Sequence, residues 1–363
     1  MKGIIAVASI TLQKLVKKFG ETVTAVAGVD LDVSDGEFMV VVGPSGCGKT
    51  TTLNMISGFE EPTSGTMLIG DRVVNHLEPG DRGLGMVFQD LALFPHMTVF
   101  ENIAFGLRVD KTADTEVKER VSKVATTMKI SHLLTKKPAQ CSGGEAQRVA
   151  LARTIITEPQ VLLMDEPLSS LDAKLRIEMR TELKRLHEEL KSTFVYVTHD
   201  QAEAMTMADR IMVMESGYVQ QIDTPLGIYR KPTNQFVGTF FGQPTMNIIP
   251  GRIENSGSSN FVSEQFELGI APDSVPGSAL GKDINLGVRS ENVTIGDEGA
   301  SGEVRLIEPL GDETLVFFSC GNEDFLVAKV DAEREFSPGD NIRFSFQPGG
   351  MHFFDAESGG RLE

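Results

Sequence analysis

Short apolar runs alternate with amphipathic stretches over the first two thirds of the chain. From about Ser9 to Val237, segments such as "FMVVVG" and "VLLMD" are apolar almost throughout, as strands buried on both faces are. Between them, apolar residues recur at helical spacing, on one face of a predicted helix over 115–130 and of another over 175–190. These faces consist of Val117, Val121, Val124 and Met128, and of Leu175, Met179, Leu183, Leu186 and Leu190. The alternation predicts an α/β fold with a doubly wound sheet.

The pattern changes after about residue 237. Apolar residues now alternate with polar ones, and clusters such as "ENSGSS", "PGSALGKD" and "GDEGASG" separate the short segments. Two of these segments are Ile284, Leu286 and Val288, and Ile342, Phe344 and Phe346. We therefore predict two domains, an α/β domain over 1–236 and a small all-β domain, interpreted as a barrel, over 237–363.

Composition narrows the functional classes. The 363 residues include 34 Lys and Arg against 51 Asp and Glu, a net charge of −17, which argues against a nucleic-acid partner. Cys47, Cys141 and Cys320 lie far apart, in no pattern typical of zinc or disulfide frameworks. No apolar run reaches the ~18 residues that a membrane-spanning helix needs. The start, "MKGIIAVASI", has some features of a signal peptide, but "TLQKLVKKFG" follows at once, so we expect a soluble chain without a removed leader.

A phosphate-binding loop follows the first apolar run. The segment "GPSGCGKT" has the Gly-x4-Gly-Lys-Thr spacing, with a predicted strand before it and the apolar helix "TTLNMISG" after it. Glycines allow backbone N–H groups to face phosphates, and the helix N-terminus adds its positive dipole end. Lys49 is expected to reach the outer phosphates and the Thr50 hydroxyl to ligate magnesium. The predicted nucleotide-binding residues are Gly43, Pro44, Ser45, Gly46, Cys47, Gly48, Lys49, Thr50 and Thr51.

Polar side chains follow three further predicted strands. In "VLLMDEP", Asp165 suits a magnesium role and Glu166 is placed to polarise an attacking water. The strand "FVYVTHD" brings His199 to a carboxyl end, where ligands of open α/β sheets bind. Gln89 follows the strand in "MVFQD" and can offer its amide oxygen to the metal. Each of these residues alone is more often structural, and the phosphate loop is what favours catalytic roles for Glu166, His199 and Gln89.

The stretch "CSGGEAQRV" predicts a second helix N-terminus suited to an anion. Ser142 is a good N-cap, and Glu145 three residues later completes a capping box. Capping alone does not require Gly143 and Gly144, each of which costs about 1 kcal/mol of helix propensity relative to alanine. We interpret the two glycines as allowing a phosphate to approach the backbone amides.

With these motifs in order, the chain resembles the ATP-binding cassette (ABC) ATPases, whose signature motif reads Leu-Ser-Gly-Gly-Gln. The resemblance implies a P-loop domain with a RecA-like core and a helical subdomain at about 91–158, and it implies ATP and Mg²⁺ as cofactors. In that family the signature of one subunit covers ATP held by the other, so Ser142, Gly143, Gly144 and Glu145 are expected to contact the partner's nucleotide. The resemblance also assigns Phe19 to adenine stacking and the "SSLD" turn ending at Asp172 to the D-loop, and it assigns Thr50, Gln89 and Asp165 to the metal.

Two signature positions depart from the family pattern. Cys141 replaces the usual leucine, a change between apolar residues with little expected consequence. Glu145 replaces the usual glutamine and brings negative charge toward a phosphate site. We therefore hypothesise that closure of the dimer around ATP is weaker in this chain than in its relatives.

The segments "FVGTFFGQPTMNIIPGRI" and "NLGVRSENV" resemble the C-terminal region of importer ATPases of the maltose and glycerol-phosphate type. This implies an OB-like C-terminal domain of the TOBE/MOP type with a regulatory role, although Ser290 stands where those relatives usually have proline. The implied partners are a second ATPase subunit, expected to be an identical chain, and integral membrane permease subunits docking near Gln89 and residues 91–107. An extracytoplasmic solute-binding protein is an indirect partner.

The expected role is therefore the ATPase that powers a sugar importer, bound peripherally to the cytoplasmic face of the inner membrane. Import of a non-sugar cargo such as a polyamine, iron or glycerol phosphate stays open, as does a soluble regulatory ATPase. For the stretch "LALFPHMTVFENIAFGL", the alternative to a docking surface is that its apolar residues fill a core.

Overall fold

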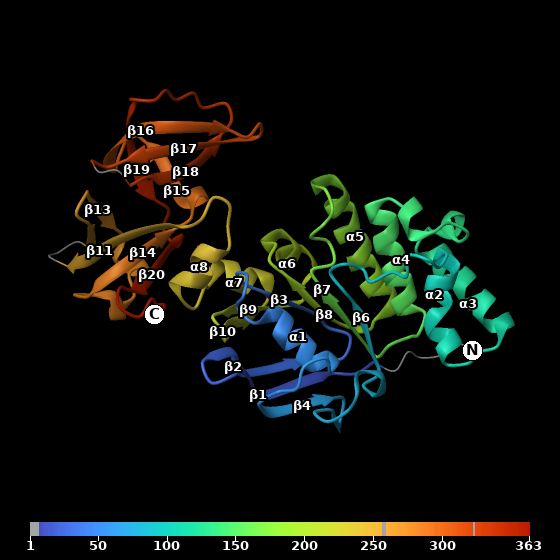
Figure 1. Ribbon diagram of the computed structural model, residues 1–363. Helices are drawn as coiled ribbons and strands as arrows, with labels where there is room; N and C mark the ends of the chain where they lie inside the picture. The colour runs from blue at the N-terminus through green and yellow to red at the C-terminus, as the bar shows by residue number, and fades with distance from the viewer. Residues whose placement is uncertain (1–6, 256–258, 322–323) are drawn as a thin grey trace. The chain divides into compact units, whose positions relative to one another are not determined.

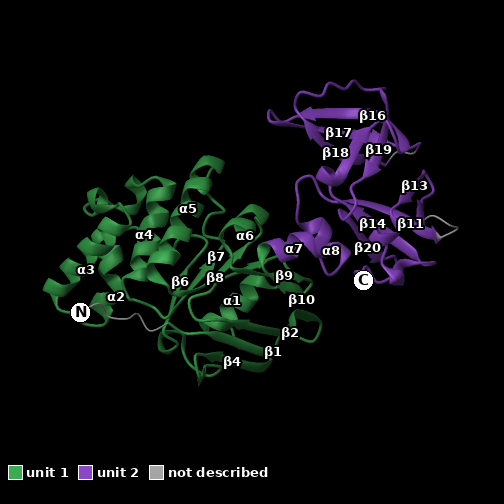
Figure 2. Ribbon diagram, turned by 180° about the vertical axis from the view of Figure 1, so that it is seen from behind, with its two compact units in different colours: residues 1–225 green, residues 226–363 purple. Residues whose placement is uncertain are grey.

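The computed structural model describes residues 7–255, 259–321 and 324–363. The chain forms two compact units, residues 1–225 and 226–363 (Figure 2). The predicted domain limit after residue 236 falls within helix α8 (Gln235–Phe240), whereas the compact units divide at the start of helix α7 (Pro225–Arg230). The first six residues of the run weighed as a signal peptide lie outside the described part of the chain.

A six-stranded sheet forms the centre of the first unit (Figure 1). Five of its strands are parallel, and only β10 runs antiparallel to its neighbour β9. Every residue of β3, β7 and β8 is buried, which explains their unbroken apolar runs. Because these strands are parallel, their carboxyl ends meet at one edge of the sheet. In spatial order the strands are β10 (Tyr218–Asp223), β9 (Arg210–Glu215), β3 (Phe38–Val42), β8 (Thr193–Thr198), β7 (Val161–Asp165) and β6 (Leu84–Val87).

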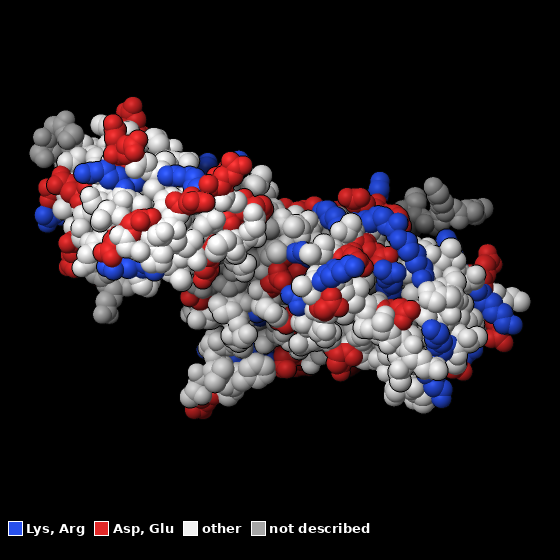
Figure 3. All heavy atoms as spheres, turned by 90° about the horizontal axis from the view of Figure 1, so that it is seen from above, with Lys and Arg blue, Asp and Glu red and all other residues white. Residues whose placement is uncertain are grey.

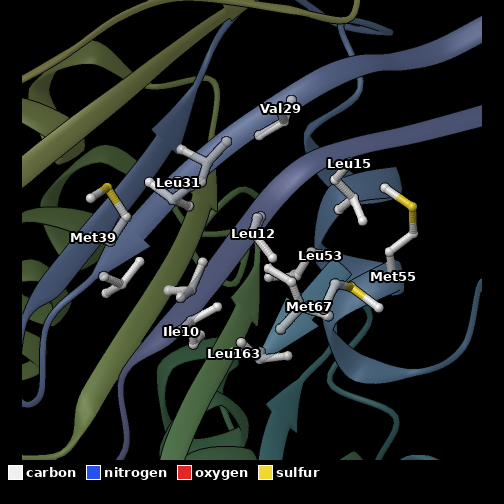
Figure 4. Packing of buried hydrophobic residues seen from close by; sticks show 14 of the residues in the cluster. Ile10, Leu12, Leu15, Val29, Leu31, Met39, Leu53, Met55, Met67 and Leu163 are labelled. Atoms are coloured by element: carbon white, nitrogen blue, oxygen red, sulfur yellow. The ribbon is translucent and has the colours of Figure 1, made fainter. Parts of the chain in front are cut away.

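A second, antiparallel sheet packs with helix α1 (Lys49–Ser57) in the main core of this unit. Its strands, in spatial order, are β2 (Val23–Val33), β1 (Ile10–Phe19), β4 (Ser64–Ile69) and β5 (Arg72–Val73). Figure 4 shows Leu12 of β1, Leu31 of β2 and Leu53 of α1 pointing into one cluster with Leu163 of β7. Burial of these side chains fixes α1, and with it the loop that precedes the helix, against the parallel sheet.

The helices of the first unit outside this core include α2 (Val99–Val109), α3 (Asp114–Thr127) and α4 (Gly143–Ile155), which contact one another. The helices predicted over 115–130 and 175–190 are confirmed as α3 and as part of α5 (Ala173–Leu190). Helix α3 ends before its predicted limit, because Lys129 adopts a left-handed φ of 56°. The shorter helices of this unit are α6 (Gln201–Met207), η1 (Pro79–Asp81), η2 (Ser131–Leu133) and η3 (Pro138–Gln140).

The second unit contains two antiparallel five-stranded sheets around one apolar cluster. The two alternating segments predicted from sequence are confirmed as strands β14 and β19, and their apolar residues are buried. The first sheet has the order β13 (Glu267–Ile270), β12 (Ser259–Val262), β11 (Asn247–Asn255), β14 (Asp283–Val288), β20 (Met351–Asp355). The second has the order β15 (Val293–Gly296), β19 (Asn341–Phe346), β16 (Ala300–Pro309), β17 (Glu313–Ser319), β18 (Leu326–Asp331). Short 3₁₀ turns lie at Pro272–Ser274, Gly277–Ala279 and Ser290–Asn292.

Acidic and basic side chains lie next to one another on the face shown in Figure 3. In the first unit, some of them pair across elements, as Arg148 of α4 does with Glu182 of α5 at 2.9 Å. Across the described residues, none of the helices has the length and apolar character needed to span a bilayer.

Candidate functional site

The loop between β3 and α1 has the backbone geometry of an anion-binding turn. Gly46 and Gly48 have φ angles of 80° and 105°, a region that residues with a Cβ rarely adopt. A Cβ at Gly48 would lie 2.4 Å from the Ala25 carbonyl oxygen, and one at Gly43 would lie 2.2 Å from that of Met214. Gly48 is also the N-cap of α1, and it has no side chain to accept from the first amides of the helix. These amides and the helix dipole are therefore available to phosphates.

Lys49, the first residue of α1, lies inside this loop. Its ammonium donates to the carbonyl oxygens of Gly43 at 2.8 Å and Pro44 at 2.9 Å, and the residue is buried. Cys47 lies beside it, with its Sγ 3.9 Å from the ammonium. Burial raises the pKa of the Cys47 thiol, and the neighbouring lysine offsets part of that effect. The loop thus encloses a fixed cation next to its amide donors.

Thr50 and Asp165 come together at the ends of neighbouring elements. The Thr50 hydroxyl donates to Oδ1 of Asp165 at 3.1 Å, joining the first turn of α1 to the carboxyl end of β7. Asp165 is buried, and desolvation raises the pKa of its carboxyl group, partly offset by the Thr50 hydrogen bond. A buried carboxylate and a hydroxyl at this spacing are hard oxygen ligands of the kind that Mg²⁺ prefers.

Glu166 and His199 form a second pair at the same edge of the sheet. The Glu166 amide donates to the Val197 carbonyl at 3.0 Å, and its φ of 43° turns the chain sharply after β7. Its Oε2 lies 3.0 Å from Nδ1 of His199, which follows β8. A left-handed φ costs a residue with a Cβ roughly 1–2 kcal/mol. The backbone is therefore strained at Glu166, the residue that carries the carboxylate. The pair is suited to orienting a water molecule for attack.

Two of the predicted site residues lie outside these close contacts. Gln89 is exposed in the turn after β6, and Phe19 at the end of β1 is 45% exposed with the Lys17 ammonium 5.1 Å from its ring centre. An exposed aromatic ring is available for stacking on a base. Among the contacts found in the described residues, none joins the 142–145 turn to the phosphate loop.

The 142–145 turn is closed by its own side chains. Glu145 Oε2 accepts from the Ser142 amide at 2.7 Å, and Ser142 Oγ accepts from the Glu145 amide at 3.4 Å, which confirms the predicted capping box. The structure adds a packing role for Gly144. Gly143 is exposed, but Gly144 is buried, and a Cβ there would lie 2.8 Å from the Leu175 side chain. Packing of α4 against α5 therefore favours a residue without a Cβ at Gly144, whereas Gly143 is open to solvent.

Sequence reasoning missed the residues that hold the loop before α2. Arg153 of α4 donates to the carbonyl oxygens of Ala92 at 2.6 Å and Leu91 at 3.0 Å, both left-handed residues. The buried Asn102 of α2 bonds both the amide and the carbonyl of Phe94. The core alternative is right for part of the 91–107 stretch, since Val99, Ile103, Ala104 and Leu107 are buried, whereas Phe105 is 38% exposed.

Comparison with known proteins bears on the family. The ABC transporter family model matches residues 26–169, the MalK OB fold domain model matches 242–293, and the TOBE domain model matches 286–354. The sn-glycerol-3-phosphate import ATP-binding protein UgpC of Cupriavidus pinatubonensis is 44% identical over 368 residues, which cover 98% of this chain and 100% of that protein. The chain belongs to the ATP-binding subunits of ABC importers. It is an ATPase whose hydrolysis of ATP drives solute import.

Other relatives agree with this assignment. The sulfoquinovosyl glycerol transport ATP-binding protein SmoE of Agrobacterium fabrum is 44% identical over 352 residues, covering 96% of this chain and 98% of that protein. The dimeric structure of MJ0796, a bacterial ABC transporter cassette, covers 60% of this chain and 98% of its own, with 32% identity and a TM-score of 0.54. CbiO1 of Clostridium perfringens has 28% identity and a TM-score of 0.57, and the match covers 60% of this chain and 89% of that one. The predicted fold class, an ABC ATPase domain followed by an OB-like and TOBE region, is confirmed.

Proposed function

We propose that residues 43–51 hold the phosphates of ATP, that Phe19 stacks on its adenine, and that Glu166 and His199 orient the attacking water. The observation that carries this proposal is the convergence of two pairs at the carboxyl ends of adjacent strands, Thr50 with Asp165 and Glu166 with His199. In such a site Glu166 polarises the water, and His199 keeps that carboxylate in line with the γ-phosphate. Asp172 is the N-cap of α5, and we assign it to a turn that faces the partner.

The donor set of the site fits magnesium. Thr50 and Asp165 supply a hydroxyl and a carboxylate 3.1 Å apart, and Gln89 would add an amide oxygen. Mg²⁺ is usually held by one or two such protein oxygens together with substrate phosphates and water. When bound, the ion neutralises charge on the phosphates. Thr50 and Asp165 would hold it, and the cation would offset the desolvation that raises the pKa of the Asp165 carboxyl group.

We infer a head-to-tail dimer of identical chains, in which the 142–145 turn of one chain covers ATP in the loop of the other. Exposure of Ser142 and Gly143 supports this arrangement, because it leaves the first amides of α4 open to a ligand from outside the chain. The dimeric structure of the MJ0796 cassette supports a dimer, and in the dimer proposed for this chain two nucleotides are enclosed.

Permease subunits are proposed to dock on the surface formed by Gln89 and residues 91–107. Arg153 and Asn102 hold the backbone of this loop in place, which suits a surface that must transmit force. Charge at Phe94 or Met97 should abolish transport while ATP binding is unchanged, since both side chains are only partly buried. Normal uptake by Phe94→Glu or Met97→Glu chains would contradict this docking site.

We propose that the transported solute is a polar compound that contains a glycerol unit, and that the chain acts at the cytoplasmic face of the inner membrane. The support is that two relatives at 44% identity are named for sn-glycerol-3-phosphate and for sulfoquinovosyl glycerol. Cargo contacts the membrane and binding subunits, so the decisive evidence must come from those partners.

The test uses a Glu166→Gln chain, which should bind ATP but hydrolyse it poorly and so hold the closed dimer. The tagged chain is isolated from detergent-solubilised native membranes with ATP and magnesium, and its partners are identified by mass spectrometry. The matched control is the Glu166→Gln chain that also carries Lys49→Ala and should not hold ATP. Recovery of integral membrane subunits with the first chain supports the importer. Recovery of soluble proteins alone, with a dimer that does form, would contradict the proposed docking of permease subunits on this chain.

A co-isolated solute-binding protein gives the test of cargo. Its thermal stability is measured with sn-glycerol 3-phosphate, with maltose and with spermidine. Stabilisation by the glycerol compound alone supports the proposed cargo class, whereas stabilisation by spermidine alone would replace it with a polyamine importer.

A further inference from the structure

Arg176 occupies a place in α5 that helix energetics disfavour. Asp172 caps this helix by accepting from the Leu175 amide at 3.0 Å, and no acidic residue lies in the first turn. Lys174 and Arg176 lie there instead, close to the positive end of the helix dipole. Since the helix itself gains nothing from a cation at this end, the contacts of Arg176 outside the helix are its evident role.

The two ends of the Arg176 guanidinium bond different turns. Its Nη2 donates to the Leu171 carbonyl at 3.0 Å, directly before Asp172. Its Nη1 donates to Oδ2 of Asp200 at 3.3 Å, directly after His199. One planar group therefore connects the turn that leads into α5 with the turn that carries His199. Because the guanidinium is planar and rigid, it sets the separation of the Leu171 carbonyl and the Asp200 carboxylate.

Hydrogen bonds tie the turn on the far side of this bridge to β8 and α6. Asp200 accepts from the Glu203 amide at 3.0 Å as the N-cap of α6, and its own amide donates to Thr198 Oγ1 at 3.0 Å. The buried Glu203 carboxylate accepts from Tyr196 at 2.8 Å and from Thr198 at 2.7 Å. Because these bonds link the turn to β8 and α6, a displacement of Asp200 is passed on to the His199 backbone.

We propose that Arg176 is a positioning residue that keeps the turn ending at Asp172 in register with the turn carrying His199, so that hydrolysis depends on both. The proposal rests on the proposed function, because it takes Glu166 and His199 as the hydrolytic pair and the Asp172 turn as partner-facing. Arg176 acts through His199: when the Asp172 turn moves, the 3.0 Å contact between His199 and Glu166 moves with it. Contact with the partner chain is thereby coupled to the orientation of the water.

The chain offers a matched control on the same helix. Lys184 of α5 donates to the Met207 carbonyl at 2.9 Å and pairs with Asp209 at 3.2 Å, so it also bridges a carbonyl and a carboxylate. The side chains of Lys184 and Arg176 are both 31% exposed. Asp209, however, precedes the amino end of β9, away from the edge that carries His199. Loss of Lys184 therefore reproduces the structural cost without touching the hydrolytic pair.

The experiment measures ATP hydrolysis by the full-length chain with Arg176→Gln, Arg176→Lys, Asp200→Asn or Lys184→Gln. Asp200→Asn keeps the N-cap of α6 and removes the charge. We expect Arg176→Gln to lower kcat by about 10- to 100-fold, the scale of a small misplacement of catalytic groups. Asp200→Asn should lower kcat by a similar factor, and Arg176→Lys should lower it less. Lys184→Gln should have the kcat of the parent. KM for ATP should stay within about twofold, because nucleotide binding is not the affected step.

A second measurement separates positioning from a structural effect. In a His199→Gln chain, the additional change Arg176→Gln should have no further effect on kcat, because the two changes remove one function. If the two losses multiply, or if Arg176→Gln behaves as Lys184→Gln does, the role of Arg176 is overturned. If Glu166→Gln hydrolyses ATP like the parent, the proposed function fails, and the inference about Arg176 fails with it.

Discussion

The two glycine-rich helix N-termini of the first unit differ in what completes them. The loop at 43–50 surrounds Lys49 with its own carbonyl groups, and backbone clashes force glycine at Gly43 and Gly48. The turn at 142–145 has no lysine, places the Glu145 carboxylate in a capping box, and leaves Gly143 exposed. We therefore interpret the first loop as a phosphate site that carries its own cation, and the second turn as a set of amides for a ligand from outside the chain.

Glycine substitutions in the first loop should have the largest effect. Gly48→Ala combines a φ of 105° with a Cβ placed 2.4 Å from a backbone oxygen, so we expect roughly 3 kcal/mol of lost stability together with loss of ATP binding. Gly46→Ala is the control, because its φ is 80° but no atom lies within 4 Å of the added Cβ. That change should cost only about 1 kcal/mol. Thermal unfolding measures the stability of the two variants, and a nucleotide-binding assay measures their affinity for ATP. Equal losses in Gly48→Ala and Gly46→Ala would contradict the steric role of Gly48.

The two glycines of the second turn should separate packing from ligand approach. Gly144→Ala forces the end of the Leu175 side chain to move, which offsets the gain in helix propensity, so this chain should be less stable than the Gly143→Ala chain by about 1 kcal/mol. Gly143→Ala meets only the end of the Leu171 side chain at 3.2 Å, and its gain in helix propensity, up to about 1 kcal/mol, should leave the free chain as stable as the parent. Gly143→Ala should instead weaken ATP-dependent dimerisation, measured by sedimentation. Dimerisation like that of the parent would remove Gly143 from the ATP contact.

The smallest effect is expected from Glu145→Gln. Hydrogen bonds from Ser142 hold the pKa of Glu145 below its usual value, so the carboxylate stays charged at the 142–145 turn. Glutamine preserves the capping box and removes that charge, and we expect dimer closure at an ATP concentration lower by about 2- to 5-fold, within the range of surface charge effects. An unchanged ATP dependence would contradict the hypothesis.

This change also alters the pH dependence of folding. A carboxyl whose pKa is lowered in the folded state stabilises the chain at neutral pH, and that contribution is lost as the pH falls through the folded-state pKa. The parent should therefore lose stability relative to Glu145→Gln on acidification. Parallel unfolding curves at all pH values would contradict the assigned hydrogen bonds.

Much of the site was predictable because its signals are local. The phosphate loop is one contiguous motif. Asp165 ends an apolar strand, and His199 and Gln89 each follow one, so parallel pairing alone brings the three residues to one edge of the sheet. The capping box at Ser142 and Glu145 is likewise encoded within four residues. The strands β14 and β19 follow from simple alternation.

Features that depend on packing between distant elements were not predictable. The packing role of Gly144 comes from Leu175 on another helix, and the bridge through Arg176 joins Asp200, which lies 24 residues further on. The left-handed turn at Glu166 follows from its amide bonding to β8 and not from the residue type. The division of the second unit into two sheets depends on strand pairings across the whole unit, which alternation cannot specify.

The most direct test of the central claim mixes two inactive chains. One carries Lys49→Ala and has an intact 142–145 turn; the other carries Ser142→Arg and has an intact phosphate loop. If the phosphate loop of one chain and the 142–145 turn of the other bind the same nucleotide, the mixture forms heterodimers with one complete site. Sedimentation then shows association again in the presence of ATP and magnesium. If the phosphate loop and the 142–145 turn of the same chain bind one nucleotide, no complete site forms, and the mixture shows no more ATP-dependent association than either chain alone.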